Sequence, residues 1–386
     1  MIIEIIFWIS VLLVFHTYLF YPFILSILSL NKKNNELVFS EDELPGVSII
    51  ISAFNEEDVI GDKLNSVIRS NYPENNYEII IGSDASTDRT AEIASSFAAE
   101  YNSINFFDYK ERRGKGNVVN DLVSNARNPV LVLTDANVMF DPDTLKNLVR
   151  HFKNNKIGLV DTNMINKGLK KEGISYQEKA YISREVKIKN QEGRLWGAMM
   201  GPFGGCYAIR REDYSAVPPN YLVDDFYINM RIFKKGKYAI NDLDARVFED
   251  VSNNLKDEFR RKVRIATGNM QNLRTFYRLL FHKRIAFGFL SHKVLRWFGP
   301  FFIIISLLSN VLLLNTRDLY IWTFLAQCVL ILIPLLDYLF KLMGYHVPYF
   351  RLITHFYAMN LALLIGFFKS FRRISKGTWD RTERNQ

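Results

Sequence analysis

The chain has 386 residues, of which 48% are apolar, and a formal net charge of +9. Its two cysteines, Cys206 and Cys328, lie in separate regions of the sequence, so a disulfide framework is not expected. The basic residues flank long apolar runs and form no known nucleic-acid-binding motif, which argues against nucleic acid as a partner and favours an anionic lipid surface.

The N-terminal run from Ile5 to Leu30 contains no Asp, Glu, Lys or Arg. A helix of about 20 such residues is long enough to cross a bilayer. No basic residue precedes the run, it is longer than the apolar part of a signal peptide, and no small-residue cleavage site appears before Lys32. We therefore expect residues 1–31 to be a retained transmembrane anchor.

Strand and helix patterns alternate from about residue 47. Short β-branched runs ended by polar residues predict strands buried on both faces, at 47–53, 77–83 and 130–134. Helical patterns lie between them, at 57–69, 88–101 and 115–126. This order predicts an α/β fold with a doubly wound, Rossmann-like sheet, whose ligands bind outside the carboxyl ends of the strands.

The predicted strands end on acidic and amide side chains: Asn55 and Glu56, then Asp84, then Asp135 and Asn137. Such residues gather along one edge of the sheet, where an anionic ligand would need a divalent cation to bridge it.

Two alternatives bear on this edge. The stretch "LVLTDAN" also fits a plain junction in which Asp141 and Pro142 open a helix. Neither a P-loop nor a G-x-G-x-x-G fingerprint occurs, which argues against ATPase and dinucleotide-binding functions. Lys115, however, lies near the start of a predicted helix, where a diphosphate also meets amide donors.

The C-terminal third is again apolar. The segment 278–297 mixes apolar and basic residues at helical spacing, which predicts an interfacial helix with Trp297 near the headgroups. Uncharged runs at 297–314, 319–336 and, more weakly, 353–368 predict membrane helices. The expected division is an anchor (1–31), a catalytic domain (32–277), an interfacial helix (278–297), a membrane region (298–370) and a basic tail (371–386).

Lysines and arginines that flank the apolar runs predict a cytoplasmic middle segment in an integral plasma or inner membrane protein. At the C-terminus, the number of predicted crossings and the distribution of basic residues predict opposite sides of the membrane. Three further crossings would place that end outside, yet it carries six basic residues that mark it as inside: Lys369, Arg372, Arg373, Lys376, Arg381 and Arg384. Either the last segment does not cross, or the rule fails here.

An ordered series of motifs between the two apolar regions resembles the family 2 glycosyltransferases. The series reads "SAFNEE", "SDASTDRTAEIA", "KGNVVN", "LTDAN", "GPFGGCYAIRR", "VDDF" and "RKVRI". It is most similar to the membrane-integrated branch with the catalytic subunits of cellulose, hyaluronan and poly-N-acetylglucosamine synthases. This resemblance implies a GT-A fold, a UDP-sugar donor, and Mg²⁺ or Mn²⁺ as cofactor.

The resemblance also implies roles for single residues. Asp225 would be the catalytic base, and Asp135 and Asn137 would hold the metal. The expected donor-binding residues are Phe54, Glu56, Asp84, Lys115, Asp135 and Arg264. The expected acceptor-binding residues are Gly204, Gly205, Asp224 and Arg261. Glu249 matches a further acidic position.

The chain departs from the family's motifs at three positions. Asn137 replaces a carboxylate, so Asp135 carries more of the metal binding, while Arg261 and Ile265 replace a Gln and a Trp. These changes leave two alternatives beside exopolysaccharide assembly by a metal-dependent hexosyl- or N-acetylhexosaminyltransferase. One is transfer of a single sugar to a lipid-linked acceptor, and the other is a catalytically silent scaffold. Accessory export subunits are expected partners of a polymerising enzyme.

Overall fold

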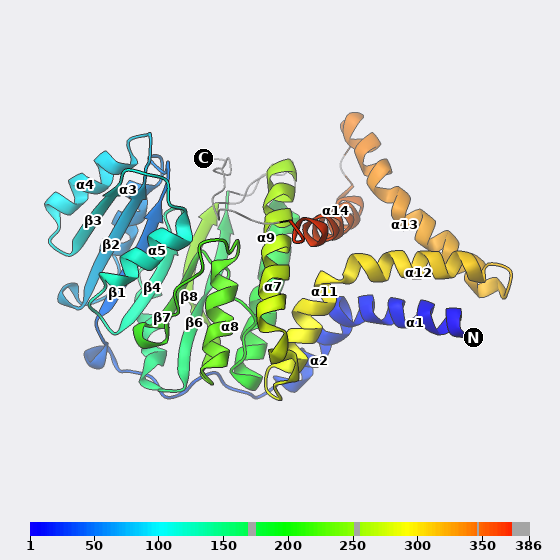
Figure 1. The fold of residues 1–386 in the computed structure, drawn as a ribbon, viewed down its shortest axis with the longest axis horizontal. Coiled ribbons are helices and arrows are strands. Elements are labelled where there is room, and N and C mark those ends of the chain that lie inside the picture. The colour runs from blue at the N-terminus through cyan, green and yellow to red at the C-terminus, as the bar shows by residue number, and fades with distance from the viewer. Residues whose placement is uncertain (169–174, 251–254, 346, 373–386) are drawn as a thin grey trace.

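The computed structural model describes residues 1–168, 175–250, 255–345 and 347–372. A mixed α/β domain carries an arm of apolar helices drawn from both ends of the chain (Figure 1). The basic tail expected at 371–386 lies almost wholly outside the described residues.

The strands are β1 (Val47–Ala53), β2 (Tyr77–Asp84), β3 (Ile104–Tyr109), β4 (Val130–Asp135), β5 (Met139–Phe140), β6 (Ile157–Lys167), β7 (Cys206–Arg210) and β8 (Tyr238–Asp250). The helices of the domain are α3 (Ile60–Ile68), α4 (Thr90–Glu100), α5 (Lys115–Ser124), α6 (Thr144–Val149), α7 (Ser175–Trp196), α8 (Asp224–Lys234) and α9 (Leu255–Phe276). Short 3-10 turns lie at Glu41–Glu43, Glu74–Asn76, Arg150–Lys153, Arg211–Asp213 and Tyr277–Phe281.

The strands form one sheet in the order β3-β2-β1-β4-β7-β6-β8-β5. The pairs from β3 to β4 are parallel, and so are β6 and β8, whereas β7 runs antiparallel to both of its neighbours. The carboxyl ends of β1, β2, β4, β6 and β8 therefore lie at the same edge. The loop that enters β7 reaches this edge as well, because β7 starts where β4 ends.

Both faces of the sheet are covered by helices. In β1, Ile49 and Ile51 pack into one core with residues of α3, α4 and α6, whereas Ile50 packs into the other with residues of α5, α8 and α9. Alternate side chains of a strand point to opposite faces, so a run of Val and Ile fills both cores. The α/β, GT-A-like fold expected from the sequence is confirmed.

The expected strands and helices are present with small shifts at their ends. The junction after "LVLTDAN" is longer than a plain strand-turn-helix junction. Met139 and Phe140 first pair with Phe248 and Val247 of β8, and α6 begins at Thr144, two residues after Pro142. Asp141 lies at the start of this helix, because its Oδ1 accepts the Asp143 N–H at 3.3 Å and its carbonyl accepts the Thr144 N–H at 3.0 Å.

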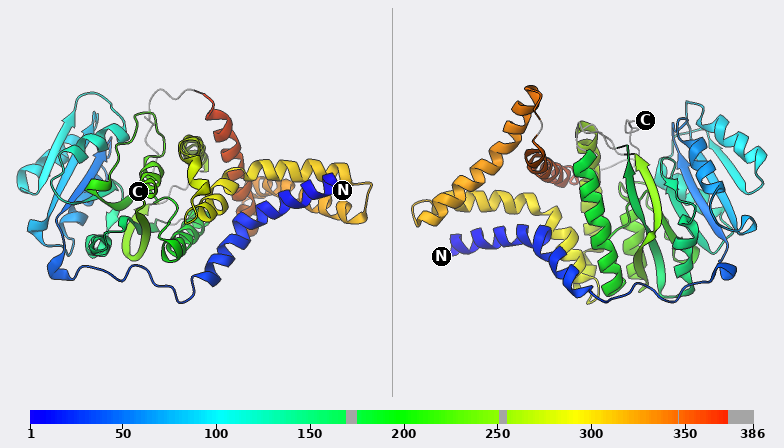
Figure 2. Two further views of the ribbon diagram at one scale, coloured as in Figure 1. Left: turned by 60° about the horizontal axis from the view of Figure 1, so that its bottom comes forward. Right: turned by 180° about the vertical axis from the view of Figure 1, so that it is seen from behind.

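The arm contains α1 (Ile2–Phe15), a π-helical turn (His16–Phe20), α2 (Tyr21–Leu28), α12 (Gly299–Leu313), α13 (Asp318–Leu342) and α14 (Pro348–Lys369). Among the described residues, three helical stretches are long and apolar enough to cross a membrane: Ile2–Leu28, Asp318–Leu342 and Pro348–Lys369. A fourth is a bent pair, Ala286–Trp297 and Gly299–Leu313, with 62° between its halves. Figure 2 shows α1 and α12 side by side over most of their length.

The segment 278–297 differs from the single helix that its sequence predicts. It consists of the end of the 3-10 turn, α10 (Ala286–Gly288), a π-helix (Phe289–Val294) and α11 (Leu295–Trp297). Trp297 packs against Phe226 and Phe289 and is only 4% exposed. This segment contacts the α/β domain closely, because the Phe226 ring of α8 packs on both Phe289 and Trp297. The expectation that Trp297 lies near the headgroups is therefore wrong, since its ring is buried against the domain. Whether its remaining face meets lipid headgroups stays a prediction.

Candidate active site

A cavity of about 870 Å³ follows the carboxyl edge of the sheet and continues toward the apolar helices. One end is lined by Phe54, Asp84, Lys115 and Asp135, the middle by the loop 201–205 and the start of α8, and the far end by residues of α7, α9 and α14. All of the site residues expected from the sequence line this cavity: Phe54, Glu56, Asp84, Lys115, Asp135, Asn137, Gly204, Gly205, Asp224, Asp225, Glu249, Arg261 and Arg264.

Asp135 ends β4 and carries the first of the two expected metal-binding side chains. Its Oδ1 accepts a hydrogen bond from Lys115 Nζ at 2.6 Å, and the same ammonium lies 4.0 Å from Asp224 Oδ2. The negative charges of Asp135 and Asp224 raise the pKa of Lys115 above its usual range, although burial opposes this. Lys115 thus occupies the cationic position between the two carboxylates.

Asn137 follows Asp135 at the start of the β4–β5 turn. Its Nδ2 donates to Glu249 Oε1 at the end of β8, 3.0 Å away. This bond orients the amide so that its carbonyl oxygen is left as the acceptor.

Lys63 of α3 lies beneath the same turn and is fully buried. Its Nζ donates to Thr134 Oγ1 at 2.9 Å and to the Val138 carbonyl at 2.5 Å, on either side of Asp135 and Asn137. Burial lowers the pKa of Lys63 to about 7. Within the described part of the chain no carboxylate forms an ion pair with it. The hydrogen bonds and the face of the Phe140 ring, 3.6 Å from Nζ, solvate it instead.

Asp84 ends β2 at the expected nucleoside end of the cavity. Both of its oxygens accept backbone N–H groups, from Arg113 at 2.6 Å and from Gly114 at 2.8 Å. Asp84 thereby fixes the loop that leads into α5 and to Lys115. Nearby, the Arg112 guanidinium stacks on the Phe54 ring, 3.2 Å from its centre, and forms one wall of this end.

Asp225 lies in the first turn of α8, beside Asp224. The loss of hydration and the negative charge of Asp224 raise the pKa of Asp225 to about 7. Gly204 approaches so closely that a Cβ there would lie 2.6 Å from Asp225 Oδ2, and its φ of +78° suits glycine. The glycine loop therefore leaves this carboxylate room to face the cavity. Asp225 is half-buried, with a raised pKa, where a proton acceptor is expected.

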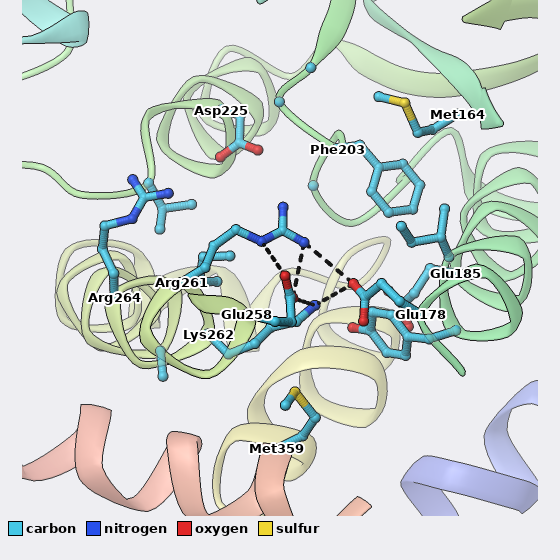
Figure 3. Close-up of a pocket in the computed structure, with 18 of the residues that line it drawn as sticks. Met164, Glu178, Glu185, Phe203, Asp225, Glu258, Arg261, Lys262, Arg264 and Met359 are labelled. Carbon is cyan, nitrogen blue, oxygen red and sulfur yellow. Dashed lines mark hydrogen bonds and ion pairs between the residues drawn. The ribbon is translucent and has the colours of Figure 1, made fainter. Parts of the chain in front are cut away.

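Arg261 and Arg264 of α9 take different positions (Figure 3). Arg264 contacts the Leu222 carbonyl just before α8. Arg261 lies between Asp225 and a buried ion cluster, donating to Glu258 Oε2 at 2.9 Å and to Glu178 Oε1 at 3.3 Å. Lys262 Nζ completes this cluster, 2.9 Å from Glu178. Arg261 is therefore bound to acidic side chains at the point where the family's Gln would stand.

Lys63, Glu178 and His355 are cavity or turn residues that the sequence interpretation missed. Lys63 shares the i, i+3, i+4, i+7 spacing of the buried side chains Ile60, Leu64 and Val67, so its place on the apolar face of the helix was the signal that could have found it. Glu178 lies in a strongly charged helix. His355 contacts Glu178 at 3.5 Å, across 177 positions of the sequence that no local pattern links. Cys206 is a fully buried free thiol whose pKa is raised to about 12 by burial.

The chemistry of the donor set fits a divalent cation that is shared with a substrate. The described residues contain no group of three or more His, Cys, Asp or Glu side chains able to hold a metal by themselves. Asp135 and the Asn137 carbonyl offer two oxygen ligands, and Mg²⁺ in particular is often held by one or two carboxylates together with substrate phosphates. The position of the Lys115 ammonium at Asp135 shows that this edge attracts a cation.

Comparisons with known proteins agree with this geometry. Residues 48–217 match the family model described as Glycosyl transferase family 2. A poly-beta-1,6-N-acetyl-D-glucosamine synthase of Staphylococcus epidermidis is 32% identical over 164 residues, which are 39% of this chain and 39% of the relative. The protein of the same description from Staphylococcus aureus strain MSSA476 is 35% identical over 136 residues, 35% of this chain and 32% of the relative. The match thus spans about two fifths or less of these curated relatives.

A solved structure shares the fold over nearly the whole chain. It is the mannosyltransferase PcManGT from Pyrobaculum calidifontis in complex with GDP-Man and Mn²⁺, with a TM-score of 0.72 and 19% sequence identity, covering 95% of this chain and 98% of that one. At this identity the likeness concerns the fold alone. Together with the family match, it shows that the chain has the GT-A fold and that residues 48–217 within it match the family 2 glycosyltransferases.

Proposed function

We propose that this protein is a membrane-embedded, metal-dependent inverting glycosyltransferase that adds N-acetylhexosamine units from a UDP-sugar to a growing exopolysaccharide. The observation that carries the proposal is the arrangement of Lys115, Asp135 and Asp225 along one cavity. Lys115 and Asp135 lie where an anionic leaving group can bind, at one end of the cavity. Asp225 lies farther along the cavity, where it can remove a proton from the acceptor. A scaffold protein would have no need of a carboxylate with a raised pKa at that point.

The donor end binds the nucleotide sugar in this proposal. Phe54, Glu56 and Asp84 form the nucleoside wall, while Lys115 moves from Asp135 to the diphosphate. Asp135 and Asn137 would hold Mg²⁺ or Mn²⁺, which when bound neutralises the charge on the leaving diphosphate. Arg264 approaches the diphosphate from α9, where its fork of donors suits phosphate oxygens.

Asp225 is the general base of the transfer. An acceptor hydroxyl gives its proton to a carboxylate oxygen of Asp225 as its own oxygen bonds to the anomeric carbon. The bond between that carbon and the diphosphate breaks on the opposite side, and the electron pair leaves with the nucleotide. Gly204, Gly205, Asp224 and Arg261 surround the path by which the acceptor reaches Asp225.

Three lines support the finer parts of the proposal. The names of the curated relatives support a polymer of N-acetylglucosamine over single-sugar transfer to a lipid. The metal is supported by the Mn²⁺ of the structural neighbour and by the oxygen ligands at Asp135 and Asn137. A cytoplasmic catalytic domain is supported by the basic residues that flank it on both sides, because cytoplasmic segments carry an excess of Lys and Arg.

The test is a donor screen on the full chain in lipid nanodiscs. UDP-N-acetylglucosamine, UDP-N-acetylgalactosamine, UDP-glucose and GDP-mannose are offered with Mn²⁺ or Mg²⁺, and nucleotide release and product length are measured. We expect release with a UDP-N-acetylhexosamine and a ladder of products. A product that stops at one added sugar would contradict polymer synthesis. Release from GDP-mannose alone would contradict the assignment of the donor.

A further inference from the structure

The last helix, α14, has the length and composition of a membrane span, yet it lies across the other apolar helices. In both views of Figure 2 and in Figure 1, α1 and α12 run away from the catalytic domain, whereas α14 runs across their direction next to α9. A helix that crossed the same membrane as α1 and α12 would run roughly along them.

Contacts at the start, middle and end of α14 lie at the same level of the molecule. Near its start, His355 faces Glu178 of α7 at 3.5 Å. In its middle, Asn360 Oδ1 lies against Gly299, the first residue of α12, where the chain leaves the catalytic domain. Near its end, Gly366 packs so tightly on Ala266 of α9 that no side chain would fit between them. The helix from His355 to Gly366 therefore stays beside the α/β domain, while Phe350 near its start packs on Phe340 of α13.

The far end of the arm is formed by other segments. Glu4 of α1 lies 3.8 Å from Arg317 and 3.3 Å from the Tyr320 hydroxyl, in the turn from α12 to α13 and the first turn of α13. Phe7, Leu313 and Tyr320 form a small apolar cluster just below it. The polar groups Glu4, Arg317 and Asp318 thus mark the membrane surface opposite the catalytic domain.

The two faces and two ends of α14 fit the boundary between headgroups and acyl chains. Its buried side chains, His355, Ala362 and Gly366, face the protein. Leu361 and Phe368 share another face, where they are 50% and 59% exposed and offer apolar surface to lipid, and Leu352 near the start of the helix is 58% exposed. Basic residues stand at both ends, with Arg351 in the first turn and Lys369 and Arg372 at the close. A helix of this kind lies in the membrane plane.

We propose that α14 is an in-plane helix whose outward face rests on the bilayer, so that the chain crosses the membrane three times, through α1 with α2, α12 and α13. The C-terminal end then lies on the same side as the catalytic domain. This arrangement removes the conflict in the charge pattern, because Lys369 and Arg372 stay on the side where the other basic clusters lie. It also makes α14 the floor of the cavity, which His355, Phe356 and Leu363 line.

The first test asks on which side the C-terminal end lies, and it needs no transfer activity. Single cysteines replace Arg372, Lys110 in the catalytic domain and Asn315 in the far turn, in a Cys328→Ser background that keeps the buried Cys206. Sealed vesicles of one orientation are treated with a membrane-impermeant maleimide. We expect Arg372→Cys to label together with Lys110→Cys, and Asn315→Cys to label only when the other side is exposed. Labelling of Arg372→Cys together with Asn315→Cys would overturn the proposal.

The second test measures the depth of α14 in the bilayer. It is needed because a different number of crossings elsewhere in the chain could leave the C-terminal end on the same side of the membrane. Spin labels are placed at the exposed positions 352, 361 and 368 of α14, and at 319, 329 and 339 of α13 as the matched control. Accessibility to oxygen against a nickel complex reports the depth of each label. We expect one shallow depth along α14 and a maximum at 329 in α13. A maximum at 361 with shallow ends would show that α14 crosses the membrane.

Discussion

At the scale of single residues, Asp225 holds its proton more strongly than an ordinary aspartate. Burial and the neighbouring charge of Asp224 both favour the protonated form, and Lys115 opposes them only partly. A general base works best when its pKa is near the working pH, because it is then both available and basic enough. The adjacent pair of acids at the start of α8 thus tunes the base as well as shaping the acceptor path.

This tuning predicts the pH dependence of turnover. Only the deprotonated carboxylate accepts a proton, so kcat should rise as the pH increases through about 7 and then level off. In Asp224→Asn the repelling charge is gone, so the pKa of Asp225 falls and the rising limb moves to lower pH. The measurement is kcat against pH at saturating donor, with each variant normalised to its own plateau. A limb that stays in place, or moves to higher pH, would show that Asp224 does not set this pKa.

Gly204 should be required for the position of Asp225 and not only for the turn. In Gly204→Ala the new methyl group meets Asp225 Oδ2, whereas Gly236→Ala has a similar positive φ of +74° and open space around its Cβ. Both substitutions should cost about 1 kcal/mol of stability, from the left-handed backbone. Only Gly204→Ala should also lower kcat, by about tenfold or more, because small displacements of a reacting group are costly. Equal kcat values in the two variants would contradict this role.

At the scale of elements, the turn from β4 to β5 is held from below and from the side. Lys63 of α3 bonds to both of its flanks, and Glu249 of β8 bonds to Asn137 within it. Thr134 and Asp135 also bond to the Gly205 carbonyl, which joins this turn to the glycine loop. A buried lysine without an ion-pair partner is costly, and its hydrogen bonds here order the segment that carries Asp135.

Replacing Lys63 by methionine should therefore loosen the metal-binding turn. Methionine keeps the volume and removes the cost of a buried charge, so the unfolding temperature should change little. The affinity for Mn²⁺ in the presence of donor should fall about tenfold, which is about 1.4 kcal/mol. Titration calorimetry on Lys63→Met measures this, with the exposed Lys110→Met as control. A lower unfolding temperature with unchanged Mn²⁺ affinity would leave Lys63 a purely structural role.

The sequence predicted the elements better than it predicted their long-range contacts. Runs such as Val47–Ala53 gave the strands, since a β-branched stretch closed by polar residues is a local signal. The motifs gave residues that do line one cavity, while the roles assigned to them stay predictions. Lys63 was not found, although it stands on the apolar face of α3 with Ile60, Leu64 and Val67, because its hydrogen-bond partners are 71 and 75 residues away in the sequence. The short strand β5 escaped because its partner is distant in sequence.

At the scale of the whole molecule, a buried network joins the N-terminal anchor to the glycine loop. Glu192 of α7 accepts hydrogen bonds from the Tyr21 hydroxyl at 2.7 Å and from the Met200 N–H at 3.0 Å, just before the loop 201–205. Its Oε1 also lies 2.8 Å from His292 Nδ1. The anchor and the segment after the catalytic domain thus meet the acceptor loop through one carboxylate.

Glu192→Gln should weaken this connection. The loss of a buried charge with several partners should cost about 3 kcal/mol, seen as a lower unfolding temperature in detergent. Donor affinity should change less than kcat, because Phe54 and Asp84 lie at the opposite end of the cavity. Tyr21→Phe removes one neutral donor and serves as the mild control, at about 1 kcal/mol. If donor affinity and kcat fell equally, the network would act on the whole fold and not on the acceptor loop.

The most direct test of the account compares the wild-type protein with Asp225→Asn and Asp135→Ala in the same nanodisc preparation, with nucleotide release followed in the presence of Mn²⁺ and acceptor. Asp225→Asn should bind donor as the wild type does, while its kcat falls by about 10²-fold or more. Asp135→Ala should lose metal-dependent donor binding itself. Wild-type turnover by Asp225→Asn would contradict the assignment of the base, and with it the claim that this cavity carries out sugar transfer.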